Sequence, residues 1–114
     1  MIDFHELDGR NEMAYPDAYE KLRKRYPDVL NAYEKLGDAA RMAGPLSERE
    51  QRLVKLALSI GAGLEGATHS HARRALEIGI GREDLQHVAL LGVTTLGFPS
   101  MVRGMTWLND LFEP

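Results

Sequence analysis

Proline and glycine divide this chain into short segments in which apolar residues recur every three or four positions, the period of an amphipathic helix. β-Branched residues never alternate with polar ones over more than a few positions, so strand signals are weak. A chain of 114 residues holds one modest core. We therefore predict a single all-α domain over residues 1–114, built of about six helices.

The first two predicted helices begin at prolines. Pro16 fits the first turn of a short helix that ends near Tyr26, after an irregular opening over residues 1–14. Because the residue before a proline avoids helical angles, a second helix is expected to begin at Pro27 and to stop at Gly44-Pro45.

The clearest helix start is the run Ser47-Glu48-Arg49-Glu50, which matches a capping box. In this motif the serine hydroxyl accepts a hydrogen bond from the third helical amide, while the glutamate accepts one from the serine amide. Residues 53–60 are apolar around more than half of the helix circumference, which predicts a central, buried helix. Gly61, Gly63 and Gly66 follow, and each weakens a helix by up to about 1 kcal/mol relative to alanine, so the central helix ends or bends there.

Three more helices are predicted in the second half of the chain. One takes in residues 68–78, and its small alanines permit close approach of a neighbouring helix. Another opens at Arg82 and is broken by Gly97-Phe98-Pro99. The last carries large apolar residues at 0, 4, 7 and 11, namely Met101, Met105, Leu108 and Phe112. Because six short helices bury limited area alone, we expect part of this face to meet a second subunit in a homo-oligomer.

Composition excludes several classes of function. The net charge of −3 gives no broad electrostatic footprint for nucleic acid, and the basic run Lys21 to Arg25 is interpreted as a solvated helix face. No apolar run approaches the ~20 residues needed to span a bilayer, and the N-terminus lacks the pattern of a signal peptide, so we expect a cytoplasmic protein without a membrane partner. The chain has no cysteine, which excludes disulfides, thiolate nucleophiles and cysteine-ligated metals.

The stretch GATHSH, Gly66 to His71, places two histidines on either side of one serine. On a helix, residues two apart point about 200° from each other, so His69 and His71 cannot face one ion there. An extended His-x-His chelates well, and His87, Glu65 and His5 are third ligands only by proximity in an unseen fold. Metal binding therefore stays open as a third hypothesis, but we expect neither a metal nor another cofactor.

An acid/base role requires fewer additional residues than a metal site, because the ordinary pKa of histidine suits proton transfer at neutral pH. If the helix starts near Glu65, then Glu65 and His69 share one face, and His71 lies on another beside small and apolar residues. We therefore expect His71 to point inward and His69 outward. A structural alternative makes His71 a buried histidine bonded to a backbone carbonyl, Ser59 or Thr94, and spacing alone favours it.

Other motifs carry less weight. The GxGxxG string over residues 61–66 follows a helix rather than a strand, so it does not predict a dinucleotide site. Ser70 lies between histidines, but no nucleophile-elbow motif surrounds it. His87 is interpreted as a helix-surface or interface residue, and Trp107 as a core or interface residue.

Residues 46–108, LSEREQRLVKLALSIGAGLEGATHSHARRALEIGIGREDLQHVALLGVTTLGFPSMVRGMTWL, contain an ordered set of motifs. These are a capped helix, a His-x-Arg-x-Ala-Leu-x-x-Gly helix from His71 to Gly79, an Arg-Glu-Asp-Leu helix start and a Thr-Leu-Gly-Phe-Pro corner. As an ensemble they resemble the carboxymuconolactone decarboxylase and AhpD-like family. The resemblance implies an all-α fold around a central helical hairpin that assembles into dimers, trimers or hexamers.

The resemblance also limits the chemistry. The redox branch of the family reduces peroxides through a Cys-x-x-Cys motif, assisted by a glutamate on the preceding helix, and these positions hold Leu64, Ala67 and Arg52 here. Thiol peroxidase activity is therefore excluded. The decarboxylase branch carries a glutamate at the position of Ala67, where Glu65 is the nearby carboxylate of this chain. His71 and Arg73 match the family pattern.

The leading hypothesis is a lyase or isomerase of this family that acts on a small organic acid. His71 would be the proton carrier, with Glu65 or His69 assisting and Arg73 holding the substrate carboxylate. The alternative, motivated by the apolar Leu64 and Ala67, is a non-catalytic ligand-binding or structural member of the family. In both cases we expect the chain to associate with itself.

Overall fold

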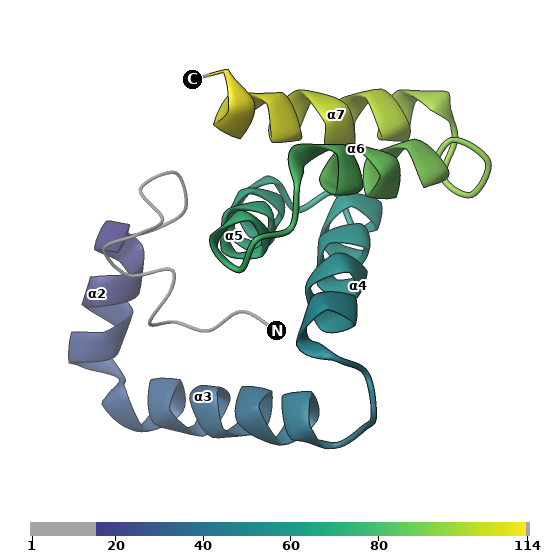
Figure 1. Ribbon diagram of the computed structural model, residues 1–114. Coiled ribbons are helices and arrows are strands. Elements are labelled where there is room, and N and C mark those ends of the chain that lie inside the picture. Colours follow the sequence, from purple (N-terminus) through teal and green to yellow (C-terminus); the bar gives the residue numbers. More distant parts are fainter. Residues whose placement is uncertain (1–15, 114) are drawn as a thin grey trace.

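The computed structural model describes residues 16–113, and all regular structure in this part of the chain is helical (Figure 1). This confirms the predicted fold class. The expected irregular opening over residues 1–14 lies outside the described residues. The helices, in chain order, are α2 (Pro16–Arg25), α3 (Pro27–Met42), α4 (Glu48–Gly61), α5 (Glu65–Glu77), α6 (Arg82–Leu91) and α7 (Phe98–Phe112).

Three helix boundaries differ from those expected from the sequence. α5 begins at Glu65, three residues before the predicted Thr68. Gly63 takes a positive φ of 72°, so the chain reverses direction within the few residues that follow α4 and the next helix can begin at once. α6 ends at Leu91, and a turn occupies the residues before Gly97. α7 begins at Phe98, with Pro99 in the first turn. A backbone N–H at this position would have no hydrogen-bond partner within the helix, so proline, which lacks this group, costs nothing there.

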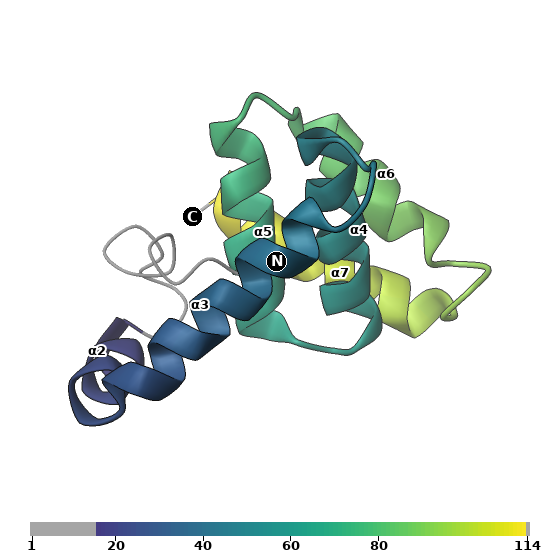
Figure 2. The same cartoon turned by 90° about the horizontal axis from the view of Figure 1, so that it is seen from below.

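Helices α4 to α7 form the body of the molecule. α5 packs most extensively against α4 and also against α7, while α6 packs against α7 and α4 (Figures 1 and 2). The core side chains come from these helices and the turn before α6: Leu56, Ile60, Ala72, Ala75, Ile80, Leu85, Ala89, Leu108 and Phe112. α5 is thus enclosed on two sides by other helices, which decides where its polar residues lie.

The predicted capping box fixes the start of α4. The Ser47 Oγ accepts a hydrogen bond of 3.1 Å from the Glu50 amide, and Glu50 Oε1 accepts one of 2.8 Å from the Ser47 amide. These bonds satisfy backbone donors that have no partner within the helix. The register of α4, and so the face that it turns toward α5, is thereby defined.

Helices α2 and α3 pack on each other and lie to one side of the α4–α7 body (Figures 1 and 2). Arg23 joins them, because its guanidinium donates to the Tyr19 hydroxyl and to Glu34 Oε1, both at 2.8 Å. Several large apolar side chains of this pair are exposed, among them Val29, Leu36 and Met42. No helix among residues 16–113 is long and apolar enough to cross a membrane.

Candidate functional site

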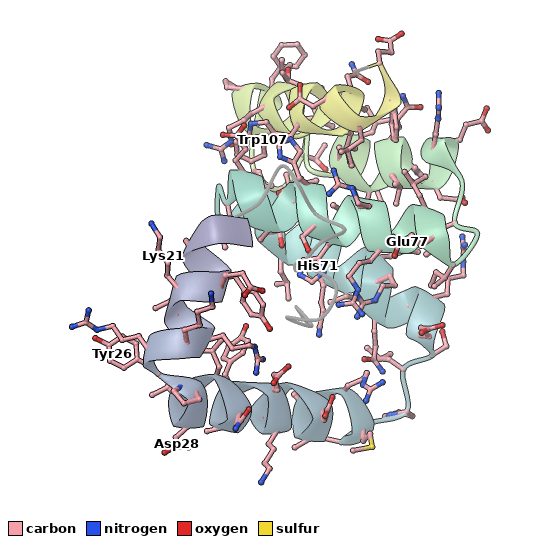
Figure 3. The ribbon with its side chains drawn as sticks, turned by 90° about the vertical axis from the view of Figure 1, so that its left-hand side faces the viewer. Lys21, Tyr26, Asp28, His71, Glu77 and Trp107 are labelled. Carbon is pink, nitrogen blue, oxygen red and sulfur yellow. The ribbon has the colours of Figure 1, made fainter. Side chains whose placement is uncertain are left out.

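His71 lies in the middle of α5 and is almost completely buried, with 4% of its surface exposed. Figure 3 shows its side chain leaving α5 on the side that faces α3. The inward orientation predicted for His71 is confirmed. A buried imidazole in the middle of a helix cannot use solvent as its hydrogen-bonding partner, so its neighbours determine its protonation.

The neighbouring charges come from α4. Arg52, Lys55 and Ser59 stand at positions 0, 3 and 7, and this spacing places them on one side of the helix. Arg52 and Ser59 are buried, and Lys55 is half-buried with its Nζ atom inaccessible to solvent. The structure therefore brings two cationic side chains to the face of α4 that packs toward His71.

This environment strongly favours a neutral imidazole. Burial, followed by the positive charges of Arg52 and Lys55, lowers the pKa of His71 from the ordinary 6.5 to about 3. Burial also lowers the pKa of the Lys55 ammonium. At neutral pH His71 is consequently an uncharged imidazole rather than an imidazolium.

One polar atom of His71 and one of Lys55 have unused hydrogen-bonding capacity. Among the described residues, neither Nδ1 of His71 nor Nζ of Lys55 has a hydrogen-bond partner. The Ser59 hydroxyl donates to the Lys55 carbonyl at 2.8 Å, and Thr94 is exposed in the turn after α6. Nδ1 of His71 therefore makes none of the bonds to a backbone carbonyl, Ser59 or Thr94 that the structural alternative expected, although the burial that it expected is present. An anion with hydrogen-bond acceptors would satisfy the ammonium group.

The outward orientation expected for His69 is wrong. His69 is 2% exposed, and its Nε2 lies 2.9 Å from Oδ2 of Asp110 in α7. The prediction failed because it treated the face of α5 opposite His71 as solvated, whereas α7 packs over it. Both histidines are buried, but they face different neighbouring helices.

Glu65 and Arg73 lie one turn before and one turn after His69, on the same face of α5. Glu65 is exposed and Arg73 is half-buried. That face points about 200° away from His71, because each helical residue adds about 100°. The assisting role expected for Glu65 and His69 and the carboxylate-binding role expected for Arg73 therefore receive no support from the arrangement around His71.

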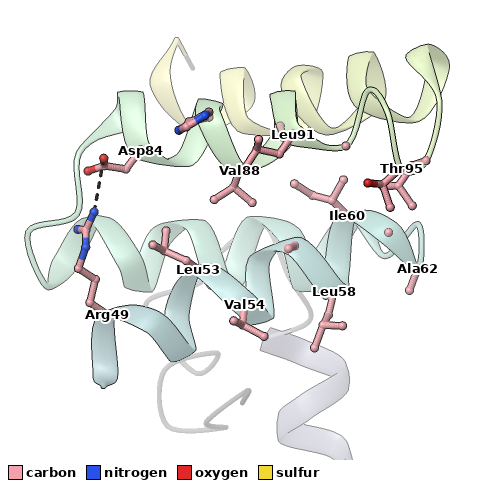
Figure 4. A pocket seen from close by; sticks show the side chains of 16 residues that line it. Arg49, Leu53, Val54, Leu58, Ile60, Ala62, Asp84, Val88, Leu91 and Thr95 are labelled. Atoms are coloured by element: carbon pink, nitrogen blue, oxygen red, sulfur yellow. Dashed lines mark ion pairs between the residues drawn. The ribbon is translucent and has the colours of Figure 1, made fainter. Parts of the chain in front are cut away.

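The other sequence motifs lie apart from both histidines. Ser70 is 1% exposed, so its hydroxyl is not accessible to a substrate from solvent. The GxGxxG string joins two helices, in agreement with its rejection as a dinucleotide motif. His87 is exposed and lines a groove of about 840 Å³ between α4 and α6 (Figure 4). This groove is largely apolar, and the Arg49–Asp84 ion pair of 3.5 Å spans its two helices at one end.

Sequence reasoning missed Lys55 and Asp110. Lys55 sits inside the apolar run of α4, where a lysine normally marks the solvated side of a helix. Asp110 follows His69 by 41 residues, and no local pattern joins them. Arg52 was singled out only as the residue that replaces a family glutamate. The change from a family glutamate to an arginine reverses the charge at this position, and this reversal is a sequence signal that could have pointed to a cationic environment for His71.

Comparison with known proteins finds sequence relatives and a matching family model. Over 103 residues, the chain is 24% identical to an uncharacterized protein of Methanocaldococcus jannaschii, a match that spans 90% of this chain and 99% of the relative. It is 33% identical over 58 residues to an uncharacterized protein of Haemophilus influenzae, covering 51% of each chain. No solved structure gives a significant match. The model of the carboxymuconolactone decarboxylase family matches residues 27–110, which include α3 to α6 and most of α7. The chain therefore belongs to the carboxymuconolactone decarboxylase family.

Proposed function

We propose that this protein is a lyase or isomerase that moves a proton on a small organic acid, with His71 as the proton carrier. The observation that carries the proposal is the pairing of a buried, neutral imidazole with the cationic side chains of Arg52 and Lys55. A neutral base beside positive charge fits a substrate that is itself an anion and that loses or gains a proton at carbon.

Arg52 and Lys55 are the proposed carboxylate-binding groups. A carboxylate accepts hydrogen bonds readily from an ammonium or a guanidinium, and such charge-assisted bonds are stronger than neutral ones. Binding would compensate the positive charges that lower the pKa of His71. The bound substrate would thus make the imidazole more basic at the moment when it must accept a proton.

The proton transfer follows from this geometry. In an isomerisation, His71 removes a proton from the carbon next to a carbonyl, the C–H electron pair moves into the carbonyl system, and the imidazolium returns the proton to another carbon. In a decarboxylation, the C–C bond to the leaving carboxylate breaks and its electron pair enters the same conjugated system. Because the bound anion raises the pKa of His71, the imidazole takes up a proton from solvent, and the imidazolium delivers that proton to the resulting carbanion. Neither route uses sulfur, which agrees with a chain that lacks cysteine.

The name of the family suggests where to begin the substrate search. We propose unsaturated five-membered lactones that carry a carboxylate, because they combine an anion with an acidic carbon next to a carbonyl. The protein would be incubated in D2O with a panel of such acids, and deuterium incorporation and CO2 release would be followed by NMR.

His71→Gln is expected to abolish exchange and turnover, while His87→Gln, which removes an exposed histidine from the α4–α6 groove, leaves both unchanged. Lys55→Gln should raise KM more than it lowers kcat. Circular dichroism would establish that the variants keep the fold. Exchange at the wild-type rate in His71→Gln would contradict the assignment.

A second candidate is a protein that binds the same anion without transforming it. The nearly complete burial of His71 favours it, because a catalytic imidazole must contact its substrate. Calorimetric binding of a lactone carboxylate without deuterium exchange, lost in Lys55→Gln, would identify this function.

We also propose that the chain associates with itself through the α4–α6 groove. Leu58 and Leu91 line this groove and expose 66% and 61% of their surfaces, an unfavourable state for large apolar side chains in water. Leu91→Glu should reduce the mass measured by sedimentation equilibrium, whereas Met42→Glu, on α3, should not. An unchanged mass in Leu91→Glu would contradict this interface.

A further inference from the structure

A second polar cluster lies on the face of α5 opposite His71. It consists of Glu65 and His69, one helical turn apart on α5, and Asp110 on α7. Each offers one ligand atom, and these atoms lie within 4.8 Å of one another. The cluster is therefore drawn from two helices whose packing fixes its geometry.

The chemistry of the three groups suits a divalent metal ion. The two carboxylates offer oxygen donors and the imidazole offers a nitrogen donor, a set found with Zn²⁺ and other first-row metals. When ligands lie about 2.0–2.1 Å from an ion, neighbouring ligand atoms are about 2.9 Å apart in an octahedron and about 3.3 Å apart in a tetrahedron. The 2.9 Å between His69 Nε2 and Asp110 Oδ2 already has this spacing.

Burial and access differ across the cluster in the way a metal site requires. His69 is 2% exposed, so its ring is held by packing with Nε2 directed at Asp110. Asp110 is half-buried, and Glu65, the first residue of α5, is exposed. An ion can thus enter past Glu65, and water can occupy the remaining coordination positions.

We propose that Glu65, His69 and Asp110 bind one divalent transition-metal ion. This site is separate from the proposed proton-transfer site, because His71 faces α4, whereas Glu65 and His69 face Asp110 on α7. It also differs from the His-x-His arrangement considered from the sequence, because it uses only one of the two histidines. The ion would tie the start of α5 to the end of α7.

The test uses the full chain purified without an affinity tag. Protein dialysed against chelator would be titrated with Co²⁺, whose visible absorption reports its coordination, and with Zn²⁺ by calorimetry. One ion per chain is expected to bind at micromolar concentration. Glu65→Gln and Asp110→Asn should each weaken binding at least tenfold, and both replacements nearly keep the size of the side chain.

Matched controls locate the ion. His71→Gln and His87→Gln should bind like the wild type, and the Zn²⁺-dependent rise in Tm expected of the wild type should be lost in Asp110→Asn. Glu65→Gln removes an exposed group, so it reports on binding even if a buried variant is unstable. Absence of binding to the wild type up to millimolar metal would overturn the proposal. Equal binding by the wild type, Glu65→Gln and Asp110→Asn would also overturn it, because the ion would then lie elsewhere.

Discussion

His71 is expected to make this protein less stable as the pH falls, and replacing it by glutamine should remove that loss of stability. Burial and the charges of Arg52 and Lys55 lower the pKa of His71 to about 3 in the folded chain, against 6.5 for an ordinary histidine. Between these two pH values the unfolded chain binds a proton at this residue and the folded chain does not. The free energy of unfolding therefore falls as the pH falls through this window.

The magnitude follows from the two pKa values. Each pH unit below 6.5 costs about 1.4 kcal/mol until the folded form also binds the proton. Between pH 7 and pH 5 His71 therefore lowers the free energy of unfolding by roughly 2 kcal/mol. Glutamine keeps a polar side chain of similar length but binds no proton in this range, so the variant lacks this loss.

Urea denaturation of the wild type and of His71→Gln at pH 7 and at pH 5 measures the effect. The packing cost of the substitution is common to both pH values, so it cancels in the comparison. On going to pH 5, the variant should gain roughly 2 kcal/mol relative to the wild type. His87→Gln, which changes an exposed histidine, should retain the wild-type dependence. Parallel pH profiles for the wild type and His71→Gln would refute the assignment of a buried, neutral imidazole.

Two further predictions concern the framework that holds the site. A Cβ added at Gly104 in α7 would lie 2.9 Å from Cγ2 of the buried Ile60, so Gly104→Ala should be about 1 kcal/mol less stable in urea despite the higher helix propensity of alanine. Gly61→Ala in α4, where the nearest atom would be 3.7 Å away, is the matched control, and a larger loss there would contradict the overpacking explanation. Ser47→Ala removes the capping box of α4 and should cost about 1 kcal/mol of unfolding free energy. An unchanged midpoint would show that the cap contributes nothing.

Local sequence signals predicted the helices well because helix starts and stops have local causes. The capping box at Ser47 is present with both of its hydrogen bonds. Pro27 begins α3 at the predicted residue. The boundary of α5 was misplaced because the positive φ of Gly63 ends the preceding turn early, and the sequence does not show which glycine of a cluster takes that conformation.

For the two clusters of polar residues, the sequence predicted the relations within α5 but not the contacts with other helices. Helical spacing separated His71 from His69 and placed Glu65 with His69, and both relations hold in the structure. Spacing within one helix cannot say which other helices cover its faces, so it could not bring Asp110 to His69 or Lys55 to His71. The error over the exposure of His69 has the same cause, since α7 comes from a distant part of the chain.

The most direct test of the proposed site is the pKa of His71, measured by NMR with labelled histidine in the presence and absence of a lactone carboxylate. Assignment would use the resonance that disappears in His71→Gln. Without ligand, the pKa should be about 3. With saturating ligand it should rise, because the carboxylate compensates the charges of Arg52 and Lys55. A pKa near 6.5 without ligand, or one that no member of the lactone carboxylate panel raises, would contradict an anion-binding, proton-transferring site at His71.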